Sequence, residues 1–193
     1  MGVLTDFFAT TESELRAYYP GWKLPLEQPI RIASKNPFTG ESAEAVSWDP
    51  DPERPVEDVG PPGPPSPSID LKGLGHTSVI SLIGIVHDSS AQAEESFMRL
   101  ALIGPEEGPW INELPPAFVA KLAKLDGADR DRVAEAWTSA ERADIAGIKD
   151  ELTRNRMLAD HDLGYWRGML DELADFARTA LSQGHRVYMW TCL

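Results

Sequence analysis

Four histidines are the side chains of this sequence best suited to acid–base or metal chemistry, namely His76, His87, His161 and His185. A metal site needs several converging ligands, and the His-Glu-x-x-His spacing of a helical zinc site is absent. The sequence also lacks a P-loop, a Gly-x-Ser-x-Gly elbow and a glycine-rich dinucleotide motif after a strand. We therefore assign no catalytic residue, no metal ligand and no cofactor. Solvated or packed side chains are the competing interpretation of the histidines.

Tryptophans beside glycines suggest a ligand pocket as an alternative hypothesis. Trp110 follows a Gly-Pro pair and Trp166 follows Leu-Gly-Tyr. A pocket near both tryptophans, with His76, His87 or His161 in its wall, would suit an enzyme or a small-ligand-binding protein. Tryptophans in such positions also anchor cores and hairpins, so the structural interpretation stays open beside the functional one.

Charge is the functional hint with the clearest physical mechanism. The chain has 31 Asp and Glu residues against 18 Lys and Arg residues, which gives a formal net charge of -13. This balance disfavours broad contact with nucleic-acid phosphates and with anionic membrane surfaces. It favours association with a basic protein, because a negative field speeds the encounter with a positive partner. The plainer interpretation, that acidity only confers solubility, stays open.

The leading functional hypothesis is therefore a non-catalytic, acidic interaction protein of the immunity or regulator type, which binds a basic protein partner. The candidate contact residues are acidic side chains in two expected loops. They are Asp49, Asp51, Glu53, Glu57 and Asp58 in a Pro-rich run, with Glu106 and Glu107 at a hairpin tip.

Cysteine content and apolar runs bear on the compartment. The single cysteine, Cys192, excludes an internal disulfide framework and a multi-cysteine zinc site. Residues 1–15 lack the basic and apolar regions of a signal peptide. The longest apolar run, residues 79–86, is too short to span a bilayer. We expect a cytoplasmic protein without membrane association, in which Cys192 is a small buried apolar side chain.

Residues 48–68 hold eight of the sixteen prolines. Proline lacks an amide donor and has a fixed φ, so neither a helix nor a central strand is expected here. We predict an extended excursion over the surface that makes few core contacts and tolerates shortening. A stiff connector and a polyproline ligand for an aromatic groove are both compatible with this composition.

The first half of the chain is predicted to begin with a strand at residues 3–9. Thr11 and Glu14 have the spacing of a capping box, which predicts a short helix directly after them. Residues 29–35 and 42–48 flank a Pro- and Gly-containing turn and roughly alternate apolar with polar side chains. They are predicted to form a hairpin.

Helices and a second hairpin are predicted after the Pro-rich run. Apolar spacing predicts a short buried helix over residues 79–86, although a strand stays possible there. Residues 96–103 and 109–114 flank a turn and are predicted to pair. Consecutive prolines then open a helix that Gly127 is expected to close, and Asp129 is expected to cap the helix after it.

The strongest helical signal is an apolar stripe from Trp166 to Leu181 with a spacing of 3.6 residues. Gly184 follows where a helix-ending glycine belongs. Residues 187–190, Val-Tyr-Met-Trp, are apolar on both faces of any strand, so this strand should be buried on both faces. We predict that the C-terminal segment is a core strand covered by the long helix.

Several segments carry a resemblance: MGVLTDFF at the start, NPFTGE, GPWINELP and the ending VYMWTCL. Together they resemble an uncharacterised set of small bacterial proteins, and the order of elements in the second half is similar to the YfbM-like domains of unknown function. The resemblance implies a single α+β domain in a bacterial cytoplasm and no particular activity. Hairpins before helices likewise indicate an α+β domain over residues 1–193, with a mixed or antiparallel sheet packed against C-terminal helices and a final strand.

Overall fold

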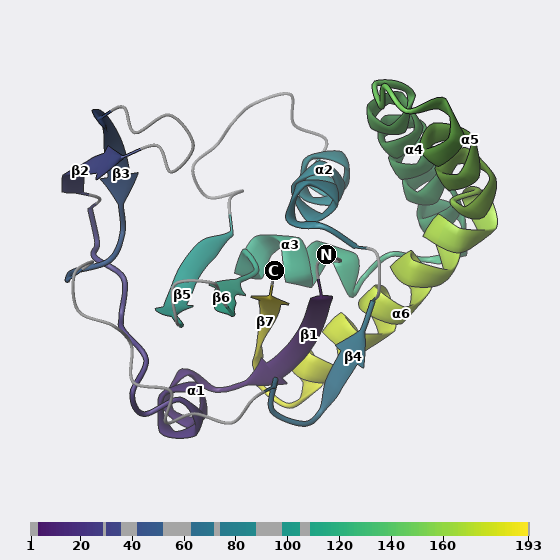
Figure 1. Ribbon diagram of the computed structural model, residues 1–193. Coiled ribbons are helices and arrows are strands. Elements are labelled where there is room, and N and C mark those ends of the chain that lie inside the picture. The colour runs from purple at the N-terminus through teal and green to yellow at the C-terminus, as the bar shows by residue number, and fades with distance from the viewer. Residues whose placement is uncertain are drawn as a thin grey trace.

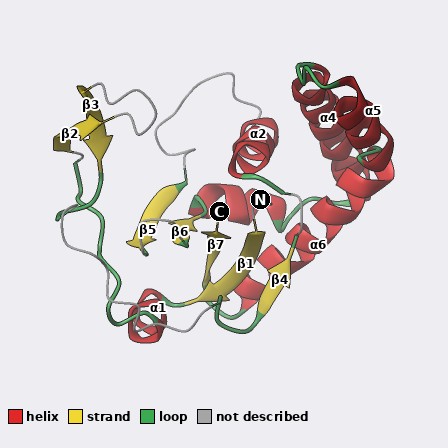
Figure 2. Ribbon diagram, viewed as in Figure 1, coloured by secondary structure: helices red, strands yellow, loops and turns green. Residues whose placement is uncertain are grey.

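The computed structural model describes residues 4–28, 30–35, 42–51, 63–71, 74–87, 98–104 and 109–192. The fold is α+β, as predicted, with helices packed on an antiparallel sheet (Figures 1 and 2). The strands are β1 Leu4–Thr10, β2 Ile30–Lys35, β3 Ser42–Ser47, β4 Ser68–Asp70, β5 Arg99–Ile103, β6 Trp110–Glu113 and β7 Arg186–Cys192. The helices are α1 Glu12–Tyr18, α2 His76–His87, α3 Pro116–Leu122, α4 Gly127–Ala146, α5 Glu151–Asp160 and α6 Leu163–Ser182.

The C-terminal strand lies at the centre of the main sheet. The strand order is β4-β1-β7-β6-β5, and every neighbouring pair is antiparallel. β7 pairs with β1 from Leu4 opposite Cys192 to Thr10 opposite Arg186, and on its other side with β6. The prediction of a core strand at the end of the chain is therefore confirmed. The expected burial of the Cys192 side chain falls outside what the structure describes.

Each face of β7 contributes to a different apolar cluster. Val187 and Met189 pack with α2, α3, α4 and α6 in the larger cluster, and Figure 1 shows α3 and α6 passing behind the strands. Tyr188 and Trp190 point to the opposite face, where they pack with Phe8 of β1 and with α1. Side chains alternate between the faces of a strand, so an uninterrupted apolar run needs cover on both sides. This explains the composition of residues 187–190.

The long helix α6 buries most of the apolar stripe that the sequence predicted, but Leu181 at the end of the stripe is exposed. Its buried residues begin at Trp166 and end at Ala180. Asp162 caps the start by accepting a hydrogen bond from the Tyr165 amide, and Gly184 follows the helix with a φ of 71°. That left-handed conformation strains residues that have a Cβ, which accounts for glycine at this position.

Two predicted helix boundaries are wrong. The helix opened by the consecutive prolines ends at Leu122 rather than at Gly127, which instead begins α4. Asp126 caps α4 by accepting from the Asp129 amide, so Asp129 is not the cap. Helix α5 was not predicted, because it has no buried residue and hence no apolar stripe in the sequence.

The early elements follow their predictions. The Thr11 hydroxyl accepts from the Glu14 amide and the Glu14 carboxylate accepts from the Thr11 amide, which is the predicted capping box. Three hydrogen bonds donated to the Glu14 carboxylate, by the Thr11 amide and by the hydroxyls of Thr11 and Thr10, lower the pKa of Glu14 to about 2. β2 and β3 form the predicted hairpin as a separate two-stranded sheet, which stands apart from the main sheet in Figure 1.

The Pro-rich excursion makes more contacts at its ends than predicted. Residues 52–62 lie outside the described part. Among the rest, the buried Tyr19 hydroxyl donates a hydrogen bond of 2.8 Å to the Gly63 carbonyl. Ser68, the last residue of the run, already belongs to β4. These contacts arise because burying a phenol requires a partner for its hydroxyl, and a proline-flanked carbonyl supplies one.

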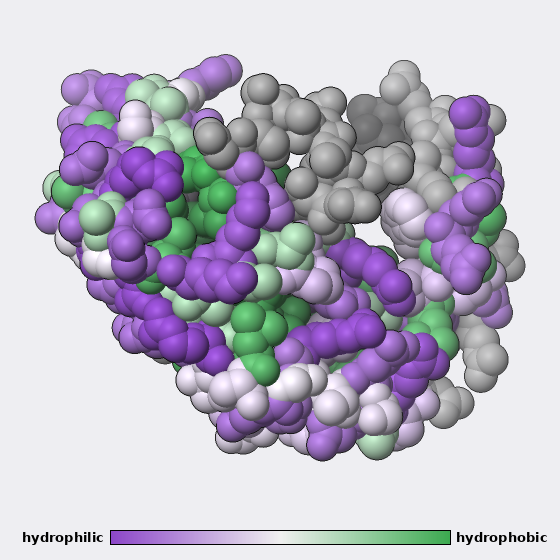
Figure 3. Space-filling view, turned by 180° about the vertical axis from the view of Figure 1, so that it is seen from behind, coloured by the Kyte–Doolittle hydropathy of each residue, from purple (hydrophilic) through white to green (hydrophobic). Residues whose placement is uncertain are grey.

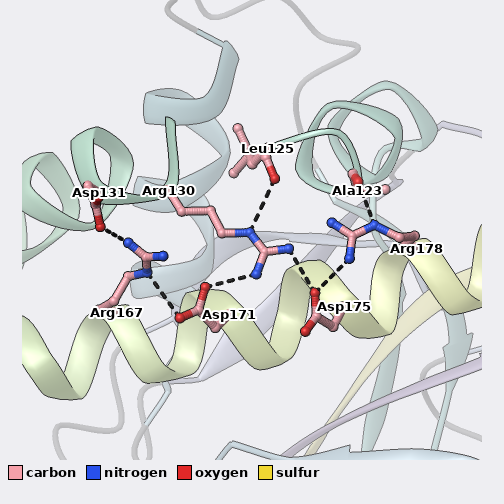
Figure 4. A network of polar contacts seen from close by, with 8 residues as sticks. All are labelled: Ala123, Leu125, Arg130, Asp131, Arg167, Asp171, Asp175 and Arg178. Carbon is pink, nitrogen blue, oxygen red and sulfur yellow. Dashed lines mark hydrogen bonds and ion pairs between the residues drawn. The ribbon is translucent and has the colours of Figure 1, made fainter. Parts of the chain in front are cut away.

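A network of arginines and aspartates joins α6 to the preceding helices (Figure 4). Arg130 of α4 donates to Asp171 and Asp175 of α6, at 2.9 and 2.7 Å, and to the Leu125 carbonyl. Arg167 bridges Asp171 to Asp131, and Arg178 joins Asp175 to the Ala123 carbonyl.

Among the helices that the structure describes, none combines the length and the apolar character needed to span a membrane.

Candidate binding cleft at the sheet edge

A cleft of about 1000 Å³ lies along the outer edge of β5. β5 is the last strand of the sheet, and beyond it only Lys23 pairs with it among the described residues. Lys23 and Ile103 exchange two backbone hydrogen bonds, at 3.1 and 2.9 Å. From Arg99 to Ala101 the outer edge of β5 has no strand partner in the described chain. We call this cavity the edge cleft.

Pro25 explains why the chain leaves β5 after Lys23. Continued antiparallel pairing would bring Pro25 beside β5, where proline has no amide to donate. The next amide, of Leu26, instead donates to the Trp48 carbonyl at 2.9 Å. Residues 24–27 therefore form the wall of the edge cleft that faces β5. Seen from behind, the molecule is hollowed between its body and the part at the right that carries β2 and β3 (Figure 3).

The lining of the edge cleft combines apolar and charged side chains. Aliphatic residues of β5 and of the opposite wall line it, together with three large aromatic side chains. The aromatic residues are Trp48, Trp110 and Tyr188. Trp48 is exposed at the rim. Apolar walls with a few placed polar groups are the usual composition of a ligand site.

Charged residues gather at the end of the cleft where β5 begins. Arg186 Nη1 lies 3.1 Å from Glu113 Oε1 and 3.5 Å from Glu12 Oε2. Arg16, one turn after Glu12 on α1, also pairs with Glu12. Arg99 stands opposite Glu113 in the β5–β6 register and lines the same cleft. Four ions are thus tied to one another, while Arg99 has no ion-pair partner among the described residues.

Two buried groups next to this charged end have unusual environments. Glu113 is only 7% exposed although it is ionisable. Burial and the nearby Glu113 carboxylate raise the pKa of Tyr188 to about 12, so the phenol stays neutral at physiological pH. The Tyr188 hydroxyl is buried and has no hydrogen-bond partner in the described part of the protein. The Arg186 guanidinium lies near this phenol and partly offsets the rise in its pKa.

The residues proposed for an alternative pocket are divided between two regions. His76 and Trp110 line the edge cleft together. Trp166 is buried in the helical cluster, and His161 packs edge-on against its ring at 5.7 Å. His87 lies 6.4 Å from the Phe118 ring, and burial with nearby Lys121 lowers its pKa. The pocket hypothesis thus keeps one tryptophan and one histidine, because the other three residues pack in or against the helical layer.

The predicted acidic contact residues are described only in part. Asp49 is not free, because its carboxylate pairs with Lys23 Nζ at 2.8 Å and caps the Asp51 amide. Asp51 is exposed, and its carbonyl accepts from Lys23. The other predicted contacts lie outside the described residues: Glu53, Glu57, Asp58, Glu106 and Glu107. Asp49 therefore serves the fold at the base of the Pro-rich run.

A second cluster of polar groups lies inside the helical layer. The Ser78 hydroxyl of α2 donates a hydrogen bond of 2.8 Å to Glu141 Oε2 of α4. The Trp137 indole donates one of 3.1 Å to the Ser78 carbonyl. Burial raises the pKa of Glu141, and Asp144 adds to the effect. Glu141 Oε1 has no hydrogen-bond partner in the described chain. Packed side chains surround this carboxyl, so it concerns stability more than ligand binding.

Apart from His76 and Trp110, the sequence analysis assigned no pocket role to the residues of the edge cleft, although two of these left a signal in the sequence. Glu113 stands between apolar residues in a predicted strand, where a charge on a buried face needs a partner. Pro25 marks a place where a strand cannot continue. Arg99 and Arg186 left no signal, because their neighbourhood depends on a pairing between distant strands.

Comparisons with known proteins add no assignment. A metal site of three or more His, Cys, Asp or Glu side chains is not found among the described residues. The resemblance to YfbM-like domains stays a prediction. No family model, no curated protein and no solved structure matches the chain.

Proposed function

We propose that this protein is a non-catalytic interaction protein that holds an extended segment of a protein partner in the edge cleft. The observation that carries the proposal is the edge of β5 from Arg99 to Ala101, which faces a cleft and lacks a strand partner in the described chain. Unpaired amides and carbonyls on a sheet edge accept another strand through main-chain hydrogen bonds.

The shape and lining of the edge cleft support a polypeptide occupant. A cavity of about 1000 Å³ is at the large end of the range for small-molecule sites. The wall of residues 24–27 leaves room for a chain between itself and β5. Trp48 and Trp110 offer broad apolar surfaces to alternate side chains of such a segment.

The net charge of -13 supports a partner that is basic as a whole. A negative field speeds the approach of such a partner, and salt weakens this effect. Exposed Asp51 lies at the base of the Pro-rich run, near the cleft wall formed by Trp48. A bacterial cytoplasm as the place of action, and the absence of nucleic-acid binding, are parts of this proposal that rest on the sequence.

A small-ligand binder is the second candidate, because His76 and Trp110 line the same cleft. An enzyme would also need a nucleophile or an acid–base pair within hydrogen-bond reach of one another. The described lining of the cleft contains arginines and glutamates that pair with one another, where an enzyme would need such reactive groups. Binding without chemistry therefore fits the described lining better than catalysis does.

Selection of peptides on the intact protein tests the proposal. Phage displaying random eight-residue peptides would be enriched on the wild type, and the binders measured by fluorescence anisotropy. Ala101→Trp fills the cleft and should weaken binding at least tenfold. Ala136→Trp, on an exposed turn of α4, is the matched control and should bind normally. Absence of binders, or equal binding by both variants, would overturn the proposal. A small molecule that raises the melting temperature only of Ala136→Trp would favour the second candidate.

A further inference from the structure

The charged end of the edge cleft is rich in arginine although the molecule as a whole is acidic, and Glu27 lies in the opposite wall. Arg16 and Arg99 line this end with the carboxylates of Glu12 and Glu113. Arg186 is not in the lining, but its guanidinium group pairs with both carboxylates. Resting on the function proposed above, we propose that the bound segment carries an Asp or Glu side chain whose carboxylate pairs with Arg99. The segment thus has an acidic residue at one position, within a partner that is basic as a whole.

The first step of the argument is that the other arginines are already engaged. Arg186 is shared between Glu113 and Glu12, and Arg16 is held by Glu12. Their positive charges are balanced within the protein. Arg99 lies close enough to contribute to the lowered pKa of Glu12, yet it makes no ion pair in the described chain. Arg99 is therefore the cation left for a ligand.

The second step concerns position. Arg99 is the first residue of β5 and belongs to the part of the edge that lacks a partner. Side chains that stand opposite one another on adjacent antiparallel strands approach to about 5 Å at Cβ. A residue of an added strand opposite Arg99 would therefore lie within reach of its guanidinium. Arginine pairs with carboxylates through two parallel hydrogen bonds, which makes a carboxylate the best-matched partner.

The third step decides between an internal side chain and a chain terminus. The Ile103 end of the cleft is closed by the Lys23 pairing, while Arg99 lies at the opposite end. Terminal carboxylates are typically captured by backbone amides, whereas Arg99 offers a side-chain guanidinium. Arg99 therefore faces a position that the bound segment passes through, and an Asp or Glu side chain fits it.

The test uses the peptides selected above on the wild-type protein. We expect Asp or Glu to be enriched at one position, and its replacement by Asn or Gln to weaken binding about tenfold, equivalent to about 1.4 kcal/mol. Arg99→Gln should weaken binding of the acidic peptide by the same factor. In this variant, replacing the Asp or Glu of the peptide should cause no further loss of affinity. Arg99→Glu should recover affinity for peptides with Lys at that position. Arg132→Glu, at an exposed site on α4, makes the same change in net charge and should leave the preference unchanged.

The possible failures are distinguishable. Peptides that are sensitive to Ala101→Trp but bind equally well with Gln in place of Glu would overturn the pairing with Arg99 and leave the proposed function intact. Loss of binding on amidation of the peptide terminus, without loss on Glu→Gln, would assign Arg99 to a terminal carboxylate and would also overturn it. Absence of any cleft-dependent peptide would overturn the proposed function itself.

Discussion

The hydroxyl of Ser78 donates a hydrogen bond of 2.8 Å to the carboxyl of Glu141, across the buried contact between α2 and α4. Glu141 is only 8% exposed, and its second oxygen has no hydrogen-bond partner in the described chain. A buried carboxyl in such a position favours its protonated form. This pair makes the stability of the helical layer dependent on pH.

Glu141→Gln should therefore stabilise the protein at neutral pH and flatten its pH dependence. Burial raises the pKa of Glu141 in the folded protein above its ordinary value of 4.5. At a pH between 4.5 and this raised pKa, the folded protein therefore binds more protons than the unfolded chain. The contribution of Glu141 to the free energy of unfolding is then full below 4.5 and falls as the pH rises through its folded pKa. Urea unfolding of both proteins from pH 4 to pH 8 measures this.

Glu135→Gln, on an exposed turn of α4, is the matched control for that series. It should unfold like the wild type at every pH. If the curves of Glu141→Gln and the wild type run parallel across the range, Glu141 is ionised in both states and the argument from burial is wrong.

Local sequence predicted the elements well, because their causes lie within one or two turns of chain. The hydrogen bonds between Thr11 and Glu14 and the apolar stripe from Trp166 depend on neighbours three or four residues apart. The strand at 187–190 was recognisable because a segment with apolar side chains on both faces is stable only where both faces are buried. Helix α5 lacked such a signal.

The candidate site was far less predictable, because it is built from long-range pairing. Glu113 and Arg186 are 73 positions apart, and only the β6–β7 register brings them together. The sequence suggested a pocket shared by Trp110 and Trp166, but Trp110 lines the edge cleft, whereas Trp166 is buried among the helices. Chain position carries no information on which face of a sheet two distant segments will share.

The central position of β7 predicts a large loss of stability when its core side chains are truncated. Met189→Ala removes a fully buried side chain between the sheet and the helices, which should lower the free energy of unfolding by about 2–5 kcal/mol. Deleting the last six residues removes the middle strand and should prevent folding. Leu152→Ala is the control, because Leu152 is 81% exposed and should change stability by less than about 0.5 kcal/mol. Chemical denaturation measures all three, and a Met189→Ala protein as stable as the wild type would contradict the packing.

The arginine network between α4 and α6 should contribute measurably because one of its members is nearly buried. The Arg130 side chain is 12% exposed and bonds two aspartates and a carbonyl. Arg130→Ala should cost about 1–2 kcal/mol, moderated by the exposure of the aspartates. Arg132→Ala, which breaks an exposed pair with Asp129, should cost less than about 0.5 kcal/mol. Equal effects of the two variants in thermal unfolding would show that burial of Arg130 adds nothing.

The contact between Tyr19 and Gly63 changes the expectation for the Pro-rich run, which composition alone would treat as freely replaceable. Tyr19→Phe removes only the hydroxyl that donates to the Gly63 carbonyl and should cost about 0.5–1.5 kcal/mol. Tyr18→Phe is the control, because the Tyr18 side chain, next to Tyr19 in the sequence, is exposed. Replacing residues 55–67 by a short Gly-Ser linker removes the same acceptor, so it should cost a similar amount, and adding Tyr19→Phe to it should recover part of the loss or leave it unchanged. If the two losses simply add in thermal unfolding, the run contributes through other contacts and the hydroxyl is not what anchors it.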